Sequence, residues 1–454
     1  MSNYKNAVLI IADDWDFIAK CYNNPVVSTP HIDKFSERSI TFDNGFCTSP
    51  SCAASRACIL TGRHSHTHGQ YGHCHGLEPF RTHRHMVTIP KVFEEAGLVT
   101  GVVGKSHVAP MEEVYPFTYQ AIGNLYELNY LKDRVDDFFN TCKNQNFYLH
   151  VAFGDPHRRG DNNGFKNEFE IEGFEQPHYK ASDVLVPDFL PDEPEVRDDL
   201  VEYYEAVSRF DHGVGSVLNA LKDQGREKDT LVIVTSDHGM PFPGAKASSF
   251  DSGHQCPFLI YTPEIENNGG RHNALMNWVD IAPTIYDWCG LKGPDDLPGR
   301  SLIPVLDQPD CEGWDETILS HTFHESKNYN PYRIIRGREF KFIYHCAPEL
   351  PSPLPTDLFR SPTWQCIKNK NLKMMGKRPT ETFLKREAIQ LFNIKEDPLE
   401  INNLANKPEY KEMVEKMMQK LFKFCLETKD PWMEIPFQKG HLKIDPMKYS
   451  KEHP

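Results

Sequence analysis

Four apolar runs in the first half of the chain set its architecture. They cover residues 7–12, 99–103, 147–153 and 230–235. Apolar residues fill both alternating faces of each run, which is typical of strands buried on both sides in a parallel sheet. Helix-forming residues and helical spacing predict helices over residues 53–60, 91–96, 198–221 and 282–290. This alternation of strands and helices predicts an α/β fold built on a large, mostly parallel sheet.

Charged and imidazole side chains follow each of these runs. In chain order they are Asp13 and Asp14, Lys105 and His107, Asp155 and His157, and Asp237 and His238. The carboxyl ends of parallel strands share one edge of the sheet, and ligands bind there. Each strand end taken alone fits a solvated loop, but the four together favour one composite site.

The alternation of strands and helices stops near residue 306. Short strands are predicted over residues 316–321, 333–336 and 340–345, and a last helix over residues 408–427. We therefore predict a larger domain over residues 1–315 and a smaller α+β domain, an antiparallel sheet covered by a helix, over residues 316–454. Residues 158–194 are polar and aromatic without periodicity, and we expect them to form loops over the site.

Composition narrows the choice of partners. The 454 residues are 39% hydrophobic and 25% charged, with a formal net charge of −14. Such an acidic chain is not expected to bind nucleic acid or an anionic membrane, and no apolar run is long enough to span a bilayer. An anionic ligand would need a local cluster of positive groups.

The first residues lead straight into a strand pattern, without the pattern of a signal peptide. We therefore expect a cytoplasmic protein as the sequence stands, or a periplasmic or lysosomal one if a leader has been removed. The 12 cysteines are scattered, with no Cys-x-x-Cys pair, which favours free thiols in a reduced compartment.

Cys52 lies at the predicted first turn of the helix over residues 53–60, after a turn at Pro50 and with Ser51 as the N-cap. The positive end of a helix dipole favours an anion and lowers the pKa of a thiol. Arg56, one turn further along the same face, adds a fixed positive charge. These features predict an anion-binding site with a candidate nucleophile. The alternative is that Cys52 is a small buried residue without chemistry.

Histidines are dense between residues 63 and 75, and His83 and His85 follow. Such density could indicate a zinc site, but the spacing fits no compact zinc motif. We expect a polar loop that borders the site.

The segment Cys52-Ala53-Ala54-Ser55-Arg56, followed by Leu60-Thr61-Gly62, resembles the Cys-x-Pro-x-Arg and Leu-Thr-Gly signature of the type I sulfatases. The sequence departs from that signature at Ala54, where the family mostly has proline. Asp155-Pro156-His157-Arg158 and Pro241-Phe242-Pro243 resemble the sulfamidase branch of the family. The resemblance extends over nearly the whole chain. It implies the alkaline-phosphatase-like sulfatase fold, with the catalytic sulfatase domain in residues 1–315.

In this family the signature cysteine is oxidised to formylglycine, whose hydrate is the nucleophile, so the resemblance implies formylglycine at position 52. It also implies a divalent cation, expected to be Ca²⁺, held by Asp13, Asp14, Asp237, His238 and the modified Cys52. Sulfamidases have asparagine where this chain has His238. An imidazole nitrogen is a softer ligand than an amide oxygen, which leaves Mn²⁺ and Zn²⁺ open.

The resemblance further implies a set of catalytic residues, namely Cys52, Arg56, Lys105, His107, His157 and Lys246. Arg56, Lys105 and Lys246 would neutralise the sulfuryl oxygens. His157, alone or with Lys246, would protonate the leaving nitrogen, and His107 would take the proton from the second hydroxyl of the hydrate. A last set is expected either to contact the sugar or, equally, to be polar residues of the surface or the domain interface: His324, Glu325 and Arg333.

The activity implied by this resemblance is hydrolysis of the N-sulfate group from terminal N-sulfoglucosamine of heparan sulfate or heparin. The partners would be that sulfated glycosaminoglycan saccharide and a formylglycine-generating or sulfatase-maturating enzyme, and a homodimer is left open. Three alternatives remain: an O-sulfatase of sulfated sugars, a phosphonate or phosphodiester hydrolase on the same scaffold, and a non-catalytic binder of sulfated glycans.

Overall fold

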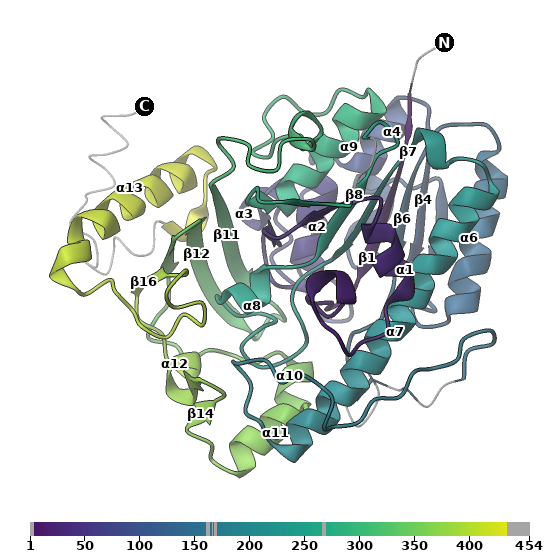
Figure 1. Ribbon diagram of the computed structural model, residues 1–454. Helices are drawn as coiled ribbons and strands as arrows, with labels where there is room; N and C mark the ends of the chain where they lie inside the picture. Colours follow the sequence, from purple (N-terminus) through teal and green to yellow (C-terminus); the bar gives the residue numbers. More distant parts are fainter. Residues whose placement is uncertain (1–3, 160–163, 166, 168–169, 266–268, 434–454) are drawn as a thin grey trace.

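A mixed sheet of eight strands forms the centre of the larger part of the molecule (Figure 1). The computed structural model describes residues 4–159, 164–165, 167, 170–265 and 269–433. In spatial order the strands are β5 (Tyr119–Ile122), β4 (Val99–Gly104), β6 (Phe147–Ala152), β1 (Asn6–Ala12), β7 (Thr230–Ser236), β8 (Phe258–Tyr261), β2 (Ile40–Phe42) and β9 (Gly270–His272). The first five run parallel, and β8 is antiparallel to both of its neighbours.

The four apolar runs of the sequence are the adjacent strands β4, β6, β1 and β7. In β1, Val8 and Ile10 pack into the core on one face of the sheet, and Leu9 and Ile11 pack into the core on the other. Because both faces are covered, these strands carry no polar alternation. The predicted parallel sheet is confirmed.

Helices cover both faces of this sheet (Figure 1). Those that pack on one face are α1 (Pro30–Ser36), α6 (Leu128–Cys142) and α7 (Pro194–Asp223), and those on the other are α2 (Cys52–Thr61), α4 (Ile89–Glu95) and α9 (Ile281–Cys289). α2 and α9 end at Gly62 and Gly290, whose φ angles of 66° and 69° lie in the left-handed region that glycine adopts without strain. α7 begins at Pro194 rather than at residue 198, and the sequence analysis did not predict α6.

A second, antiparallel sheet lies beside the first. Its order is β11 (Glu316–Phe323), β12 (Tyr329–Gly337), β13 (Phe340–His345) and β16 (Ile389–Asn393). One face packs against α13 (Lys411–Glu427) through Leu421 and Phe422, and the other against Phe46 and Leu275 of the larger part. Three of these strands and the helix were predicted, and β16 was not. The division of the chain at residue 315 stays a prediction.

Short elements connect these layers. They are η1 (Lys20–Tyr22), β3 (Gly45–Phe46), α3 (Ser65–His68), α5 (Met111–Val114), η2 (Glu227–Asp229), α8 (Asp251–His254), β10 (Met276–Asn277), η3 (Trp278–Asp280), η4 (Ile303–Val305), α10 (Thr356–Arg360), α11 (Pro362–Asn369), β14 (Met374–Met375), β15 (Arg378–Pro379), α12 (Thr380–Leu384), η5 (Pro408–Tyr410) and η6 (Pro431–Met433). α11 packs against α7, which brings α10 to the larger part of the molecule. Within the described ranges, no helix has both the length and the apolar character needed to cross a bilayer.

Candidate active site

The carboxyl edge of the large sheet opens into a pocket of about 730 Å³ that contains Cys52. Asp13 after β1, Lys105 and His107 after β4, and His157 after β6 line it. The remaining wall comes from residues within the segments 73–78, 106–109, 122–126, 324–325 and 356–360. The strand ends after β1, β4 and β6 therefore meet in one cavity, whereas Asp14, Asp155, Asp237 and His238 do not line it.

Cys52 is the first residue of α2 and is 1% exposed. Its Sγ lies 3.2 Å from Nε2 of His238. Burial would raise the pKa of the Cys52 thiol, but the positive charges of Lys246 and Lys105 hold it well below its usual 9.0. Ser51 occupies the N-cap position as predicted, but its hydroxyl makes no capping bond, since it lies 2.9 Å from Nδ1 of His324 instead.

Three buried carboxylates lie beside Cys52. Asp13, Asp14 and Asp237 offer oxygens that all lie within 4.8 Å of one another. Oδ1 of Asp14 is buried and accepts no hydrogen bond from the described residues, although Nε2 of His238 is 3.2 Å away. Burial raises the pKa of Asp237 to about 7. Clustered carboxylates with an unsatisfied oxygen fit a hard divalent cation such as Ca²⁺, which prefers oxygen ligands.

Three positive side chains border the same cluster. The guanidinium of Arg56 is fully buried and donates from Nε to Oδ2 of Asp237 across 3.1 Å. Nζ of Lys105 donates a hydrogen bond to Oδ2 of Asp13. Nζ of Lys246 lies 2.9 Å from Oδ2 of Asp14. The three cations balance the charge of the three carboxylates, so a divalent cation bound there would make the cluster positive, as binding of an anion requires.

Two histidines at the pocket have opposite electrostatic environments. Burial and the charge of Lys105 lower the pKa of His107 well below its usual 6.5. Burial and Lys246 would also lower the pKa of His157, but the carboxylates of Asp14 and Asp13 raise it. His107 is therefore set to accept a proton and His157 to donate one.

The three residues expected to contact a sugar or an interface have different positions. His324 and Glu325 line the pocket. Both carboxylate oxygens of Glu325 bond to Thr356, so this side chain also holds the start of α10. Arg333 does not line the pocket. It is fully buried and donates to Asp430, which corrects its assignment as a sugar contact.

Sequence reasoning missed two residues of α10 that line the pocket. Asp357 accepts a hydrogen bond from Lys246 across 2.8 Å. Arg360 lines the mouth, and within the described part of the chain its guanidinium makes no hydrogen bond or ion pair. No signal in the sequence places α10 next to strands more than 100 residues away, since the contact depends on the packing of α11 against α7.

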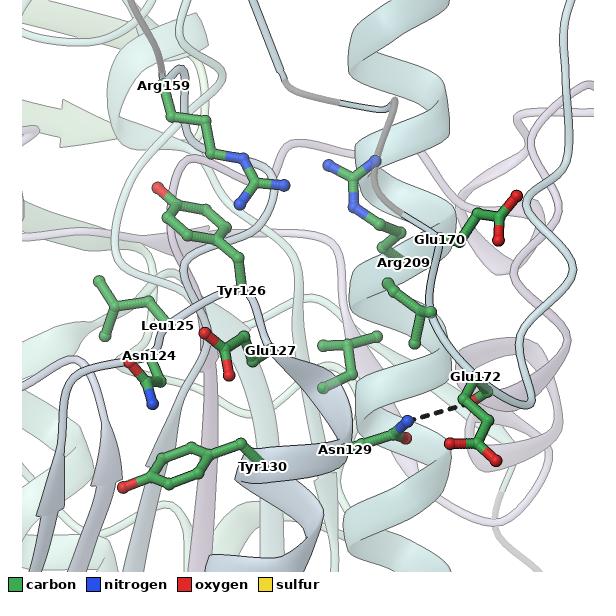
Figure 2. A pocket seen from close by; sticks show the side chains of 12 residues that line it. Asn124, Leu125, Tyr126, Glu127, Asn129, Tyr130, Arg159, Glu170, Glu172 and Arg209 are labelled. Carbon is green, nitrogen blue, oxygen red and sulfur yellow. Dashed lines mark hydrogen bonds between the residues drawn. The ribbon is translucent and has the colours of Figure 1, made fainter.

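The long loop after β6 borders a second cavity rather than the Cys52 pocket. This cavity has a volume of about 740 Å³. Figure 2 shows Arg159, Glu170 and Glu172 from the loop among the side chains that line it. Tyr126 lines both cavities, so they are neighbours. The expectation that residues 158–194 cover the Cys52 site is therefore wrong for those residues of the loop that the structure describes. Residues 160–163, 166 and 168–169 lie outside the described ranges.

The histidine-rich segment divides into three parts. His73 and His75 line the Cys52 pocket, as the border loop predicts. His64 and His66 are buried against Phe424 of α13. His83 and its neighbour His85 are exposed.

Comparison with known proteins agrees with this fold and site. Residues 5–291 match the family described as Sulfatase, and residues 245–350 match the family described as N-sulphoglucosamine sulphohydrolase, C-terminal. The chain belongs to the sulfatase family, and it is a hydrolase of that class.

Among its relatives, human N-sulphoglucosamine sulphohydrolase is 34% identical, over 95% of this chain and 92% of the relative. An ulvan-active sulfatase of Formosa agariphila is 26% identical, over 93% of this chain and 80% of the relative. A solved protein in complex with its substrate, D-glucosamine-2-N,6-O-disulfate, has a TM-score of 0.68 and 20% identity, over 94% of this chain and 99% of that chain. The phosphonate monoester hydrolase of Agrobacterium radiobacter has a TM-score of 0.69 and 18% identity, over 93% of this chain and 96% of that chain. These two solved structures have the same fold as this chain.

Proposed function

We propose that the protein hydrolyses the sulfur–nitrogen bond of N-sulfoglucosamine at the end of a heparan sulfate or heparin chain. The reaction consumes water and yields the free amino sugar and sulfate. The observation that carries the proposal is one cluster of Cys52, three buried carboxylates and three cations, which Cys52, Asp13 and Lys105 join to the pocket. The 34% identity to a protein named for this reaction supports the choice of substrate.

Two groups would complete the site. Formylglycine made from Cys52 would supply, as its hydrate, the oxygen that attacks sulfur. A divalent cation, with Ca²⁺ preferred by the oxygen-rich ligand set, would stabilise negative charge at that oxygen. Asp13, Asp14, Asp237 and His238 would hold the cation. Mn²⁺ remains compatible with the imidazole of His238.

The chain's own cations bind and orient the sulfuryl group. Lys105 lines the pocket with Cys52, and the charges of Lys105 and Lys246 lower the pKa of the Cys52 thiol, which supports a role for both in neutralising sulfuryl oxygens at residue 52. Arg56 is buried beside the carboxylate cluster and holds the Asp237 side chain in place through a hydrogen bond. Preorganised positive groups of this kind stabilise charge that develops in the transition state without reorganisation.

Two histidines move the protons. His157, whose protonated form the nearby carboxylates favour, donates a proton to the leaving nitrogen, because an amine leaves readily only when it is protonated. His107, kept neutral by burial and Lys105, accepts a proton at residue 52. The two opposite pKa directions support this division of roles.

The proposal is tested by sulfate release from N-sulfoglucosamine, compared with glucosamine 6-O-sulfate, N-acetylglucosamine 6-O-sulfate and a phosphonate monoester. Selective release from the N-sulfate is expected. Preference for the O-sulfates would make the protein an O-sulfatase, and preference for the phosphonate would move it to the other hydrolases of this fold. Mass spectrometry of the peptide that contains residue 52 should find the aldehyde. A thiol in protein that turns over would overturn the proposed nucleophile.

A further inference from the structure

Four imidazole rings gather on one wall of the Cys52 pocket. The ring centroid of His73 lies 4.2 Å from that of His324 and 4.8 Å from that of His107, and the His75 and His107 centroids are 4.9 Å apart. They come from residues 73–75, 107 and 324, which lie too far apart in the sequence to form a compact motif. None of the roles proposed above requires His73 or His75.

The free ring nitrogens of this cluster lie close to the thiol. One ring nitrogen each of His73 and His107 and the Sγ of Cys52 all lie within 4.8 Å of one another. Nε2 of His73 and Nδ1 of His107 are buried, and among the described residues the Cys52 thiol is the one group at His107 that could satisfy its free nitrogen. Buried polar atoms without a partner are unfavourable, so these two nitrogens favour a ligand that satisfies them.

The other nitrogen of His107 is held in place. Its Nε2 lies 2.9 Å from Nδ1 of His75. A second histidine in this position orients a metal-binding imidazole and fixes its tautomer. The backbone of His107 also has a φ angle of 52°, a left-handed conformation that is uncommon for a residue with a side chain. The surrounding structure therefore holds the His107 ring at the cluster.

Cys52 lies between two sets of ligands of different chemistry. On one side are Asp14 and Asp237, whose carboxylate oxygens suit a hard cation, together with the imidazoles of His157 and His238. On the other side are the two imidazoles of His73 and His107, which together with a thiolate suit Zn²⁺ in a tetrahedral site with one position open. The thiol belongs to the second set only while it is not oxidised.

We propose that the protein with an unmodified Cys52 binds Zn²⁺ through Cys52, His73 and His107, with His75 orienting His107. Binding displaces the thiol proton and leaves a thiolate on the metal. The metal fills the pocket at residue 52, where the sulfuryl group is proposed to bind. This site is lost when the thiol becomes an aldehyde. The proposal does not depend on which sulfate ester or sulfamate the mature enzyme hydrolyses.

The test uses Co²⁺ as a spectroscopic substitute for Zn²⁺, added to the full chain in excess Ca²⁺ after mass spectrometry has verified the thiol at residue 52. We expect a thiolate-to-cobalt charge-transfer band with the intense visible bands of tetrahedral Co²⁺, and loss of both when Zn²⁺ is added. Cys52→Ala should abolish the charge-transfer band. Cys74→Ala is the matched control, because Cys74 lines the same pocket, and it should retain the band.

The imidazole ligand is tested by a second matched pair. His73→Gln should weaken Co²⁺ binding at least about 10-fold, whereas His83→Gln, which removes an exposed histidine of the same segment, should leave it unchanged. Circular dichroism checks that each variant is folded. Absence of the band, its loss in Cys74→Ala, or its full retention in His73→Gln would each overturn the proposal. The last result would place the metal on the carboxylate side of Cys52.

Discussion

Lys246 donates a hydrogen bond to Asp357 across 2.8 Å, although 111 residues separate them in the chain. The same Nζ lies 2.9 Å from Asp14 at the carboxylate cluster, so one ammonium group joins α10 to the proposed cation site. Its position between two carboxylates explains why the pKa of Lys246 is well above its usual 10.5, despite burial. The charge that is proposed to face the sulfuryl group is therefore permanent.

Asp357→Asn should lower kcat for N-sulfoglucosamine about 10-fold, because Lys246 loses one of the two carboxylates that orient it. The matched control is Asp188→Asn, which breaks a surface pair with Lys377 and should leave kcat unchanged. Steady-state kinetics with both variants measure the difference. An unchanged kcat in Asp357→Asn would show that Asp14 alone positions Lys246.

The pH profile should reflect the two histidines. Because the pKa of His107 is lowered and the pKa of His157 is raised, His107 is neutral at a pH at which His157 still holds its proton. Activity should fall at low pH as His107 gains a proton and at high pH as His157 loses its proton. His157→Gln should remove the alkaline limb and lower kcat about 100-fold or more.

An aryl sulfate provides the control for that assignment. Its phenolate leaves without a proton, so His157→Gln should impair its hydrolysis far less than that of N-sulfoglucosamine. Equal impairment of both substrates would mean that His157 acts in binding and not as the acid.

Removal of divalent cations should destabilise the protein. Without a cation, the buried carboxylates of Asp13, Asp14 and Asp237 face one another at close range. Ca²⁺ at 100 times its Kd should add about 2.7 kcal/mol of stability, measured as a rise in Tm. Asp14→Asn should reduce that rise. Titrations with Mn²⁺ and Zn²⁺ show whether His238 shifts the metal preference of the site away from Ca²⁺. If Ca²⁺ left the Tm of the wild type unchanged, the proposed cation site would be contradicted.

The buried ion pair of Arg333 and Asp430 should add a stabilising contribution that is lost in acid. Burial would raise the pKa of Asp430, but Arg333 lowers it from 3.8 to about 2. A lowered pKa means that the contribution, on the order of 2 kcal/mol, is complete above pH 4 and lost as the pH falls through 2. The gap in unfolding free energy between wild type and Asp430→Asn should therefore narrow between pH 4 and pH 2.

Urea unfolding at several pH values measures this gap. Asp315→Asn is the control, since it removes the partner of Arg338 at the surface and should change stability little at any pH. A gap that stays constant in acid would mean that Asp430 contributes through packing alone.

Arg360 should select substrates that carry a second anionic group. Its guanidinium lines the mouth of the pocket without a partner in the described ranges, so it can pair with a carboxylate or sulfate elsewhere on the saccharide. Arg360→Gln should lower kcat/KM about 10-fold for a substrate with a second anion and little for N-sulfoglucosamine itself. Arg84→Gln, a change at an exposed arginine, is the control. An equal effect on both substrates would exclude selection by Arg360.

The centre of the fold was predictable because β1, β4, β6 and β7 are covered on both faces, which leaves a strong apolar signal. β16 was missed because it is short and its pairing with β13 depends on the whole C-terminal region. α6 was missed although its buried residues have helical spacing, so in this case the signal was present.

The site was predictable where chemistry follows a strand. Asp13 directly follows a predicted strand, His157 comes four residues after another, and both lie in the pocket. Asp357 and Arg360 carried no local signal, since tertiary packing brings them there. Arg333 was misplaced because an arginine in a strand looks the same in sequence whether it faces a ligand or a buried aspartate.

The pocket has two sources, with its reactive floor on the strand ends and α2 and its rim on α10 and residues 324–325. Asp357 bonds to Lys246, His324 contacts Ser51 and Glu325 holds the start of α10, but Arg360 can be substituted without altering the groups that break the bond. Selection of new saccharides, in nature or in a library, can therefore proceed by mutating Arg360 and its neighbours at the surface. Such variants would keep the same bond-breaking chemistry.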